Sequence, residues 1–247
     1  MNDVEPPSIQ NIDFQAGSTL LIDKPQGWTS FDVVNKVRHR LRKLTGIKRI
    51  KVGHAGTLDP LATGLLILCT GKFTKKLTEF QGWDKEYTGT FLLGGTTPSY
   101  DAETEVDQAY PYEHIDEAGL ETARQSFLGT IQQVPPMFSA IKVNGQPLYK
   151  KARKGEKVEI QARTVHIHEF ELNNIQIPEV SFRLKCSKGT YVRSLAHDIG
   201  KILDSGAYLT ALRRTEVGPY RIEKAWNLDE LIEALEARIE EKDRLVL

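Results

Sequence analysis

Residues 51–72 read KVGHAGTLDPLATGLLILCTGK, and they are the most informative stretch of this 247-residue chain. Glycines at four positions allow tight turns and close backbone approach: Gly53, Gly56, Gly64 and Gly71. The apolar run at residues 65–69 predicts a short buried strand. The segment is therefore expected to be a glycine-rich loop that leads into a sheet.

A carboxylate, Asp59, stands in the middle of this loop and is followed by Pro60. Asp-Pro is a good start for a helix, with Asp59 as N-cap and Pro60 in the first turn. Gly64, however, would interrupt such a helix after one turn. A carboxylate on a loop that enters a buried strand is instead a candidate nucleophile or base. No second acid lies near it in the sequence, which argues against a paired-carboxylate glycosidase.

On the N-terminal side of the loop, residues 18–22 predict a buried strand and residues 24–27 a turn. Thr29 or Ser30 is expected to cap a helix, because apolar residues follow at helical spacing: Phe31, Val34, Val37 and Leu41.

On the C-terminal side, hydrophobic and polar residues alternate in residues 86–93 and 180–187, which predicts strands. Helices are expected at residues 116–127, 229–239 and 190–203, the last burying Leu195, Ile199 and Ile202. Strands and helices do not strictly alternate, so the fold class is predicted to be α+β. Residues 135–163 show little periodicity, and a loop of this length is usually a functional flap or disordered.

Basic residues are clustered although the 33 basic and 33 acidic side chains cancel. Residues 38–51 hold seven Lys or Arg and no acid, and residues 142–157 hold six with one acid. Such runs are often only solvated surface. They also suit the local phosphate contacts by which proteins bind nucleic acids, so the pattern permits RNA binding without proving it.

Other features narrow the class of protein. There is no apolar run of membrane-spanning length and no secretory signal at the N-terminus, so a cytoplasmic protein is expected. Cys69 and Cys186 stand in apolar stretches and are expected to be buried free thiols. His166 and His168 share a strand face, but no pattern of ligands completes a metal site around them.

The sequence resembles one known family along residues 20–221. GHAGTLDPLATG closely resembles the catalytic motif of the TruB-type pseudouridine synthases. Further segments resemble that family in the same order: LLIDKPQGWTSFDVV, KEYTGTFLLG, QVPPMFSAIKVNGQPLYKKARKG, CSKGTYVRSLAHDIG and GAYLTALRRTEVGPY. The resemblance implies the pseudouridine synthase fold, with a central mixed, mainly antiparallel sheet flanked by helices and loops. It would occupy residues 18–222, after a flexible leader (1–17), with an RNA-gripping loop at about 135–163 and a short helical tail (223–247).

The resemblance also assigns roles to site residues. Asp59 would be the nucleophile, and His54 would help to displace the target nucleotide from the RNA stack. Tyr87 would stack on the flipped uracil, and Arg193 would pair with the Asp59 carboxylate. Tyr191 and Leu212 would line the uridine pocket, and Lys24 and Pro25 would pack under the catalytic loop. RNA phosphates are expected to meet Arg38, Arg42, Lys150, Lys151 and Arg153.

Each role has a plainer alternative when the residue is taken alone. Tyr87 stands on an alternating strand and suits ordinary core packing, whereas His54 suits a surface loop. Arg193 falls in the first turn of its expected helix, where a cation opposes the helix dipole by up to about 1 kcal/mol. A solvated arginine is one reading. A buried carboxylate partner is the other, and Asp59 would supply it.

The implied activity is isomerisation of uridine to pseudouridine in the T-loop of tRNA, at the position numbered 55 by tRNA convention. This reaction is redox-neutral, so neither a cofactor nor a metal is expected, and the protein is expected to be a monomer. Two alternatives stay open: an RNA chaperone that does not need Asp59, and a hydrolase that releases free uracil. Only about 25 residues follow Arg221, which disfavours the family's C-terminal RNA-binding domain and its guide-RNA-dependent role.

Overall fold

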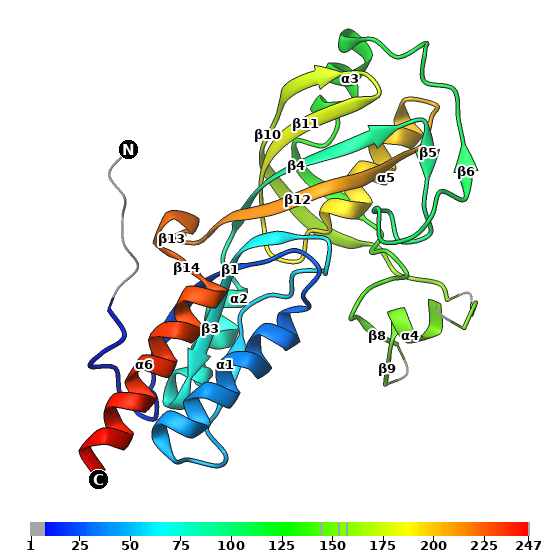
Figure 1. The fold of residues 1–247 in the computed structure, drawn as a ribbon. Coiled ribbons are helices and arrows are strands. Elements are labelled where there is room, and N and C mark those ends of the chain that lie inside the picture. The colour runs from blue at the N-terminus through cyan, green and yellow to red at the C-terminus, as the bar shows by residue number, and fades with distance from the viewer. Residues whose placement is uncertain (1–7, 144, 153, 157, 247) are drawn as a thin grey trace. The chain divides into compact units, whose positions relative to one another are not determined.

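The computed structural model describes residues 8–246, except 144, 153 and 157. The chain forms two compact units, each described here by itself (Figure 1). The first unit combines Met1–Lys85 with Arg213–Leu247, and the second unit is Glu86–Leu212. Strand β12 (Ala207–Val217) contributes residues to both.

The sheet of the first unit is centred on β1 (Thr19–Lys24) and β3 (Thr63–Thr70), which pair antiparallel. Strand β14 (Trp226–Asn227) lies parallel to β1, and β2 (Val52–His54) lies antiparallel to β3. The first residues of β12 that belong to this unit, Arg213 and Arg214, run parallel to β3. The C-terminal end of β12 pairs antiparallel with β13 (Tyr220–Arg221). The predicted strand at 65–69 is thus confirmed, as part of a longer strand buried along most of its length.

The helices of the first unit are α1 (Ser30–Thr45), α2 (Leu77–Gln81) and α6 (Leu228–Val246), with short 3-10 turns at Gly71–Lys76 and Ile222–Lys224. Thr29 caps α1 as predicted, through a reciprocal pair of hydrogen bonds with Asp32. Of the apolar residues noted at helical spacing, Phe31 does not join the core: its exposed fraction is 61%, and Val33 is buried instead.

Helix α6 neutralises part of the basic helix α1. Lys36 pairs with Asp229 at 2.9 Å, and Arg40 pairs with Glu236 at 2.6 Å. Arg42 stays exposed. Within the basic run of the sequence, Arg40 thus forms an ion pair with the acidic C-terminal helix, whereas Arg42 remains accessible to solvent.

The strands of the second unit follow the order β12, β4 (Lys85–Leu93), β11 (Glu179–Cys186), β10 (Arg163–Gln176) and β7 (Gly129–Gln133). Strand β10 pairs antiparallel with both β11 and β7. The alternation predicted for residues 180–187 is confirmed, since every second side chain of β11 is buried. Short strands β5 (Gly95–Thr96) and β6 (Gln108–Ala109) pair separately.

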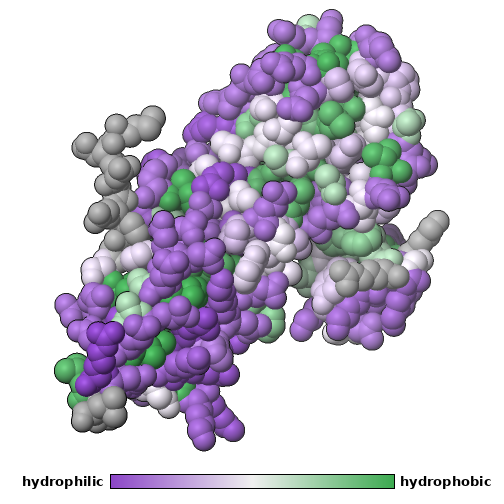
Figure 2. Space-filling model, viewed as in Figure 1, coloured by the Kyte–Doolittle hydropathy of each residue, from purple (hydrophilic) through white to green (hydrophobic). Residues whose placement is uncertain are grey.

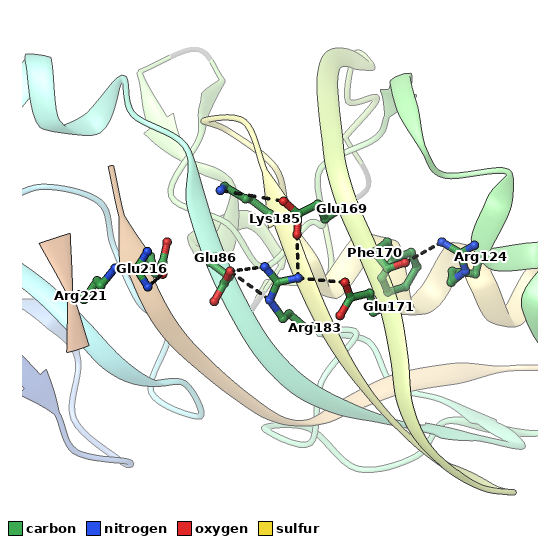
Figure 3. Close-up of polar contacts among 9 residues, drawn as sticks. All are labelled: Glu86, Arg124, Glu169, Phe170, Glu171, Arg183, Lys185, Glu216 and Arg221. Carbon is green, nitrogen blue, oxygen red and sulfur yellow. Dashed lines mark hydrogen bonds and ion pairs between the residues drawn. The ribbon is translucent and has the colours of Figure 1, made fainter. Parts of the chain in front are cut away.

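Three strands of this sheet are bridged by Arg183, shown in Figure 3. Its guanidinium lies 2.7 Å from Glu86 on β4, 2.7 Å from Glu169 on β10 and 3.1 Å from Glu171 on β10. An arginine fork suits several carboxylates at once, so this cluster joins β4, β11 and β10 on their polar face.

The longer helices of the second unit are α3 (Glu117–Gln125) and α5 (Val192–Ile202). Asp116 caps α3, in agreement with the helix predicted at 116–127. Helix α5 buries Leu195 and Ile199 as predicted, but the prediction for Ile202 is wrong: it is 52% exposed and is the last residue of the helix.

Residues 134–162, which include nearly all of the segment without periodicity (135–163), form a small lobe that we call the insertion (Figure 1). It holds β8 (Lys142–Val143), β9 (Gln146–Pro147) and α4 (Leu148–Ala152). These elements are too short to leave a periodic pattern in the sequence. The outer part of the insertion is largely hydrophilic in Figure 2.

Two further expectations concern the cysteines and membrane-spanning helices. Cys69 and Cys186 are buried free thiols, as expected, and burial raises the pKa of Cys69. Within the described residues, no helix is both long and apolar enough to cross a membrane.

Candidate active site

Asp59 lies on the loop between β2 and β3, and its side chain is half-buried. Residues 59–62 form a turn in which the Ala62 amide donates to the Asp59 carbonyl at 3.1 Å. The residues after the turn enter β3 rather than a helix. The interpretation of Asp59 as a helix N-cap is therefore wrong, and its role as a nucleophile or base stays a prediction.

The backbone on each side of Asp59 is held by a different element. The Ser30 hydroxyl at the start of α1 accepts from the Leu58 amide at 2.8 Å and donates to the Leu58 carbonyl at 3.0 Å. The Gly27 amide donates to the Pro60 carbonyl at 2.8 Å. The turn after β1 thus contacts the loop through Gly27, and the packing of Lys24 and Pro25 under the loop stays a prediction. These bonds fix the backbone on both sides of Asp59.

A buried arginine, Arg214 on β12, supports the same loop from the other end. Its exposed fraction is 1%, and its guanidinium donates to the carbonyls of Gly56 at 3.1 Å and Leu65 at 2.7 Å. Its backbone passes so close to Gly64 that a Cβ built there would lie 2.3 Å from the Arg214 carbonyl. Gly64 is therefore required for the approach of β3 to β12, where its φ is +101°.

His54, at the end of β2, is half-buried in the same loop region. Burial lowers the pKa of His54, and the Arg214 guanidinium lowers it further. The imidazole is therefore neutral at neutral pH. Its Nδ1 is buried and has no hydrogen-bond partner within the part of the chain that the structure describes. A purely surface histidine, the plainer reading of the sequence, does not describe it.

In the second unit, Tyr191 is the N-cap residue of α5 and is held along its backbone and its ring. The Tyr191 amide donates to Gln133 Oε1 at 2.7 Å, and Gln133 Nε2 donates to the Tyr191 carbonyl at 3.0 Å. The guanidinium carbon of Arg163 lies 4.5 Å from the centre of the Tyr191 ring. Gln133 and Arg163 were not found from the sequence, where nothing local marks them.

Arg193 stands one residue into α5 and is only 5% exposed, so the reading as a solvated arginine is wrong. Its Nε lies 3.5 Å from the Asp101 carboxylate, which is itself buried. It also donates to the carbonyls of Ser99 and Phe138, both at 2.8 Å. A carboxylate partner was expected, but Asp101 was missed. The pairing with Asp59 stays a prediction.

The remaining predicted pocket residues lie on neighbouring strands of the second unit. Tyr87 on β4 is 8% exposed, and Leu212 on β12 is partly buried. Burial of Tyr87 suits core packing as well as stacking on a base, so its role stays a prediction.

The predicted RNA-binding residues differ in their solvent exposure and in their hydrogen bonds within the protein. Arg38 donates to Asn35 Oδ1 and to the Val52 carbonyl, both at 2.8 Å, whereas Arg42 is exposed. In the insertion, Lys150 is exposed and Lys151 is half-buried on α4. Arg153 lies outside the described residues.

No metal centre emerges from the described residues, in which no group of three or more His, Cys, Asp or Glu could hold an ion. His166 and His168 share one face of β10 as predicted, with ring centres 4.7 Å apart. His166 Nδ1 instead shares a hydrogen bond of 3.0 Å with the Thr130 hydroxyl.

Two family models match the chain. Residues 42–192 match the N-terminal domain of the TruB family of pseudouridylate synthases, and residues 193–247 match the C-terminal domain of tRNA pseudouridylate synthase B. Among similar proteins, a tRNA pseudouridine synthase B of Flavobacterium johnsoniae is 55% identical over 225 residues, which are 91% of this chain and 98% of that protein. One of Phocaeicola vulgatus is 53% identical, over 91% of this chain and 96% of that protein.

Solved structures agree in fold. A Cbf5–Nop10–Gar1 complex contains a chain with a TM-score of 0.67 and 30% identity, over 89% of this chain and 54% of that one. An H/ACA ribonucleoprotein bound to a substrate RNA with 2′-deoxyuridine gives a TM-score of 0.63 and 27% identity, over 89% of this chain and 53% of that one. This chain thus spans about half the length of those solved chains. On its motifs, family models and full-length relatives, the chain belongs to the TruB family of pseudouridylate synthases.

Proposed function

We propose that this chain isomerises uridine to pseudouridine in tRNA, at position 55 of the T-loop, with Asp59 as the nucleophile. The observation that carries the proposal is the placement of Asp59 on a loop fixed at Leu58 and at Pro60. A rigid loop holds a nucleophile near its reacting atom, which removes much of the entropic barrier. The two similar proteins described above match this chain over nearly their whole length and are named tRNA pseudouridine synthase B. This similarity supports tRNA as the substrate.

The chemistry balances within the nucleotide. The C1′–N1 glycosidic bond breaks, the uracil turns while it is held in the pocket, and C5 is joined to C1′ with loss of its proton to N1 or solvent. Asp59 supports this either by attack at C6, by attack at C1′, or by promoting elimination to a glycal. In each case the carboxylate must be ionised and must reach an extruded base.

Base extrusion needs groups that replace the lost stacking. Stacking of a base on an aromatic ring contributes about 1–3 kcal/mol, comparable with the few kcal/mol lost on unstacking. In our proposal Tyr87 supplies that face, while Tyr191 and Leu212 line the uridine pocket. His54, neutral at pH 7, helps to displace the nucleotide without adding a buried charge. Arg193, which pairs with Asp101 in the structure, is in our proposal also the partner of the Asp59 carboxylate.

Binding of the T-arm is assigned to the exposed cations. Arg42 on α1 and Lys150 on α4 are exposed, and Arg38, Lys151 and Arg153 complete the set. Folded RNA is read mainly by shape and phosphate contacts, for which such clusters are suited. The proposal includes action as a monomer in the cytoplasm, without cofactor or metal.

An unmodified tRNA transcript tests the proposal. Incubation with the purified protein is expected to place pseudouridine at position 55, as mapped by chemical labelling and primer extension, with no free uracil in the chromatogram. Release of uracil would instead identify a hydrolase. Improved folding of the tRNA without any pseudouridine would identify an RNA chaperone.

A further inference from the structure

Two residues that face each other across β7 and β10 grip Tyr191 from different directions. Gln133 and Arg163 are register partners in this strand pair. The Gln133 side chain binds both polar groups of the Tyr191 backbone, at 2.7 and 3.0 Å, and is itself 2% exposed. The Arg163 guanidinium covers the Tyr191 ring, 4.5 Å from its centre. One cross-strand pair therefore fixes the backbone and the ring of the same residue.

This pair also closes the base of the insertion. The chain leaves the sheet after Gln133, at the end of β7, and returns at Arg163, at the start of β10. The first arm of the insertion bonds to the same turn of α5. The Ser194 hydroxyl donates to the Val134 carbonyl at 2.8 Å, and Arg193 donates to the Phe138 carbonyl at 2.8 Å. These bonds connect the insertion to the start of α5.

The chemistry of Arg163 argues against a role as a simple packing residue. Its Nε and Nη2 are buried without a hydrogen-bond partner among the described residues. Unpaired buried donors destabilise a fold, and an apolar side chain would cover the tyrosine ring without that loss. A guanidinium differs in that it is flat and charged, so it holds an aromatic ring parallel to itself.

We propose that Gln133 and Arg163 are a positioning pair that couples RNA held by the insertion to the orientation of Tyr191. RNA bound to the insertion fixes the two strand ends, and the pair then sets the Tyr191 backbone and ring for the extruded uracil. The proposal rests on the proposed function in two respects, namely that Tyr191 lines the uridine pocket and that the insertion binds RNA.

Arg163→Met removes the charge and roughly keeps the length of the side chain. Arg163→Lys keeps the charge but lacks the planar guanidinium group. We expect Arg163→Met to lower the single-turnover rate at saturating protein about 10- to 100-fold, because small misplacements at a reacting centre have effects of this size. The tRNA Kd is expected to stay within about twofold, and Arg163→Lys to restore only part of the rate.

A second comparison separates positioning from direct contact with RNA. In a Tyr191→Leu background, which lacks the ring, Arg163→Met is expected to have no further effect on the rate. A phosphate contact by Arg163 predicts something else: a raised Kd, a flatter salt dependence, and an undiminished effect in the Tyr191→Leu background. That result would overturn the proposal.

Coupling to the insertion has its own measurement. Charge reversal at Lys150 and Lys151 is expected to lower both affinity and the rate at saturation in the wild-type protein. In the Arg163→Met protein the same reversal should lower affinity alone, because the link to Tyr191 is already broken. If the charge reversal lowers the rate by the same factor in the wild-type and Arg163→Met proteins, the coupling between the insertion and Tyr191 is contradicted.

Arg183→Met is the matched control, because it removes another arginine from the same sheet. Arg183 contacts Glu86, Glu169 and Glu171, so its loss lowers stability while the rate stays at the wild-type value. Wild-type protein that forms no pseudouridine contradicts the proposed function. Active wild-type protein with an equally active Arg163→Met variant contradicts only the positioning pair.

Discussion

The Ser30 hydroxyl binds both the amide and the carbonyl of Leu58, at 2.8 and 3.0 Å, and so ties the start of α1 to the residue before Asp59. Both residues are buried. This two-way bond joins segments that are 28 residues apart and explains why a helix with no catalytic group of its own belongs to the candidate site.

Ser30→Ala leaves two buried polar groups of Leu58 without their partner. Each such group costs about 1–3 kcal/mol, so we expect a loss of about 2–6 kcal/mol in the free energy of unfolding measured with urea. The single-turnover rate should fall about tenfold, since the loop that carries Asp59 is loosened. Ser126→Ala is the control, because that hydroxyl donates to the Ala123 carbonyl in the last turn of α3. A Ser30→Ala protein with the wild-type rate would count against the role of the loop.

Gly64→Ala is expected to prevent stable folding of the first unit. The new Cβ would lie 2.3 Å from the Arg214 carbonyl at a φ of +101°. A backbone clash of this kind should cost more than about 3 kcal/mol. Gly27→Ala is the comparison: its φ is +79°, but among the described residues no heavy atom lies within 4 Å of the added Cβ. It should cost only about 1 kcal/mol, by the same urea measurement.

Acid is expected to destabilise the second unit through His197, which stacks on Tyr100 with ring centres 3.7 Å apart. Burial, with a smaller effect of Lys201, lowers the pKa of His197 from 6.5 to about 4. Between these values the unfolded chain binds a proton that the folded chain does not, so stability falls as pH drops from about 6.5 to about 4. The loss should be about 1–2 kcal/mol after allowance for solvent screening of a half-buried ring.

His197→Phe keeps the ring stack and removes the titrating group. Its unfolding free energy, measured at about pH 7 and about pH 4.5, should fall less than that of the wild-type protein. An equal fall in both proteins would show that His197 is not a source of the acid sensitivity.

Charge reversal in the insertion should weaken tRNA binding and flatten its salt dependence. Lys150→Glu and Lys151→Glu, with Arg153→Glu as a third member, remove phosphate contacts, and the removal of one such contact lowers the slope of log K against log salt by about 1. Filter binding across a salt series measures this slope. Lys201→Glu, which reverses an exposed charge at the end of α5, should leave it unchanged.

Much of the fold follows from local sequence patterns. Thr29 and Asp32 define the start of α1, and every second residue of β11 is buried as its alternation indicates. The exposure of Phe31 follows from its place in the helical repeat. The buried residues of α1 recur at helical spacing from Ser30, whereas Phe31 comes one residue later, roughly 100° round the helix.

Contacts between distant parts of the sequence at the candidate site could not be predicted. His54 and Asp59 share one motif, but Arg214 reaches Gly56 across 158 positions and Gln133 reaches Tyr191 across 58. Neither contact leaves a periodic or compositional trace. Arg193 was identified as unusual because a cation in a first helical turn needs a partner, yet its partner Asp101 has no such mark in the sequence.

The substitution Asp59→Asn tests the account most directly, because it removes the charge and keeps the size of the side chain. Single-turnover assays on an unmodified tRNA transcript should show pseudouridine formation reduced at least about a thousandfold, with tRNA affinity close to that of the wild-type protein. Pseudouridine formation by the pure Asp59→Asn protein at near the wild-type rate would contradict the assignment of Asp59 as the nucleophile.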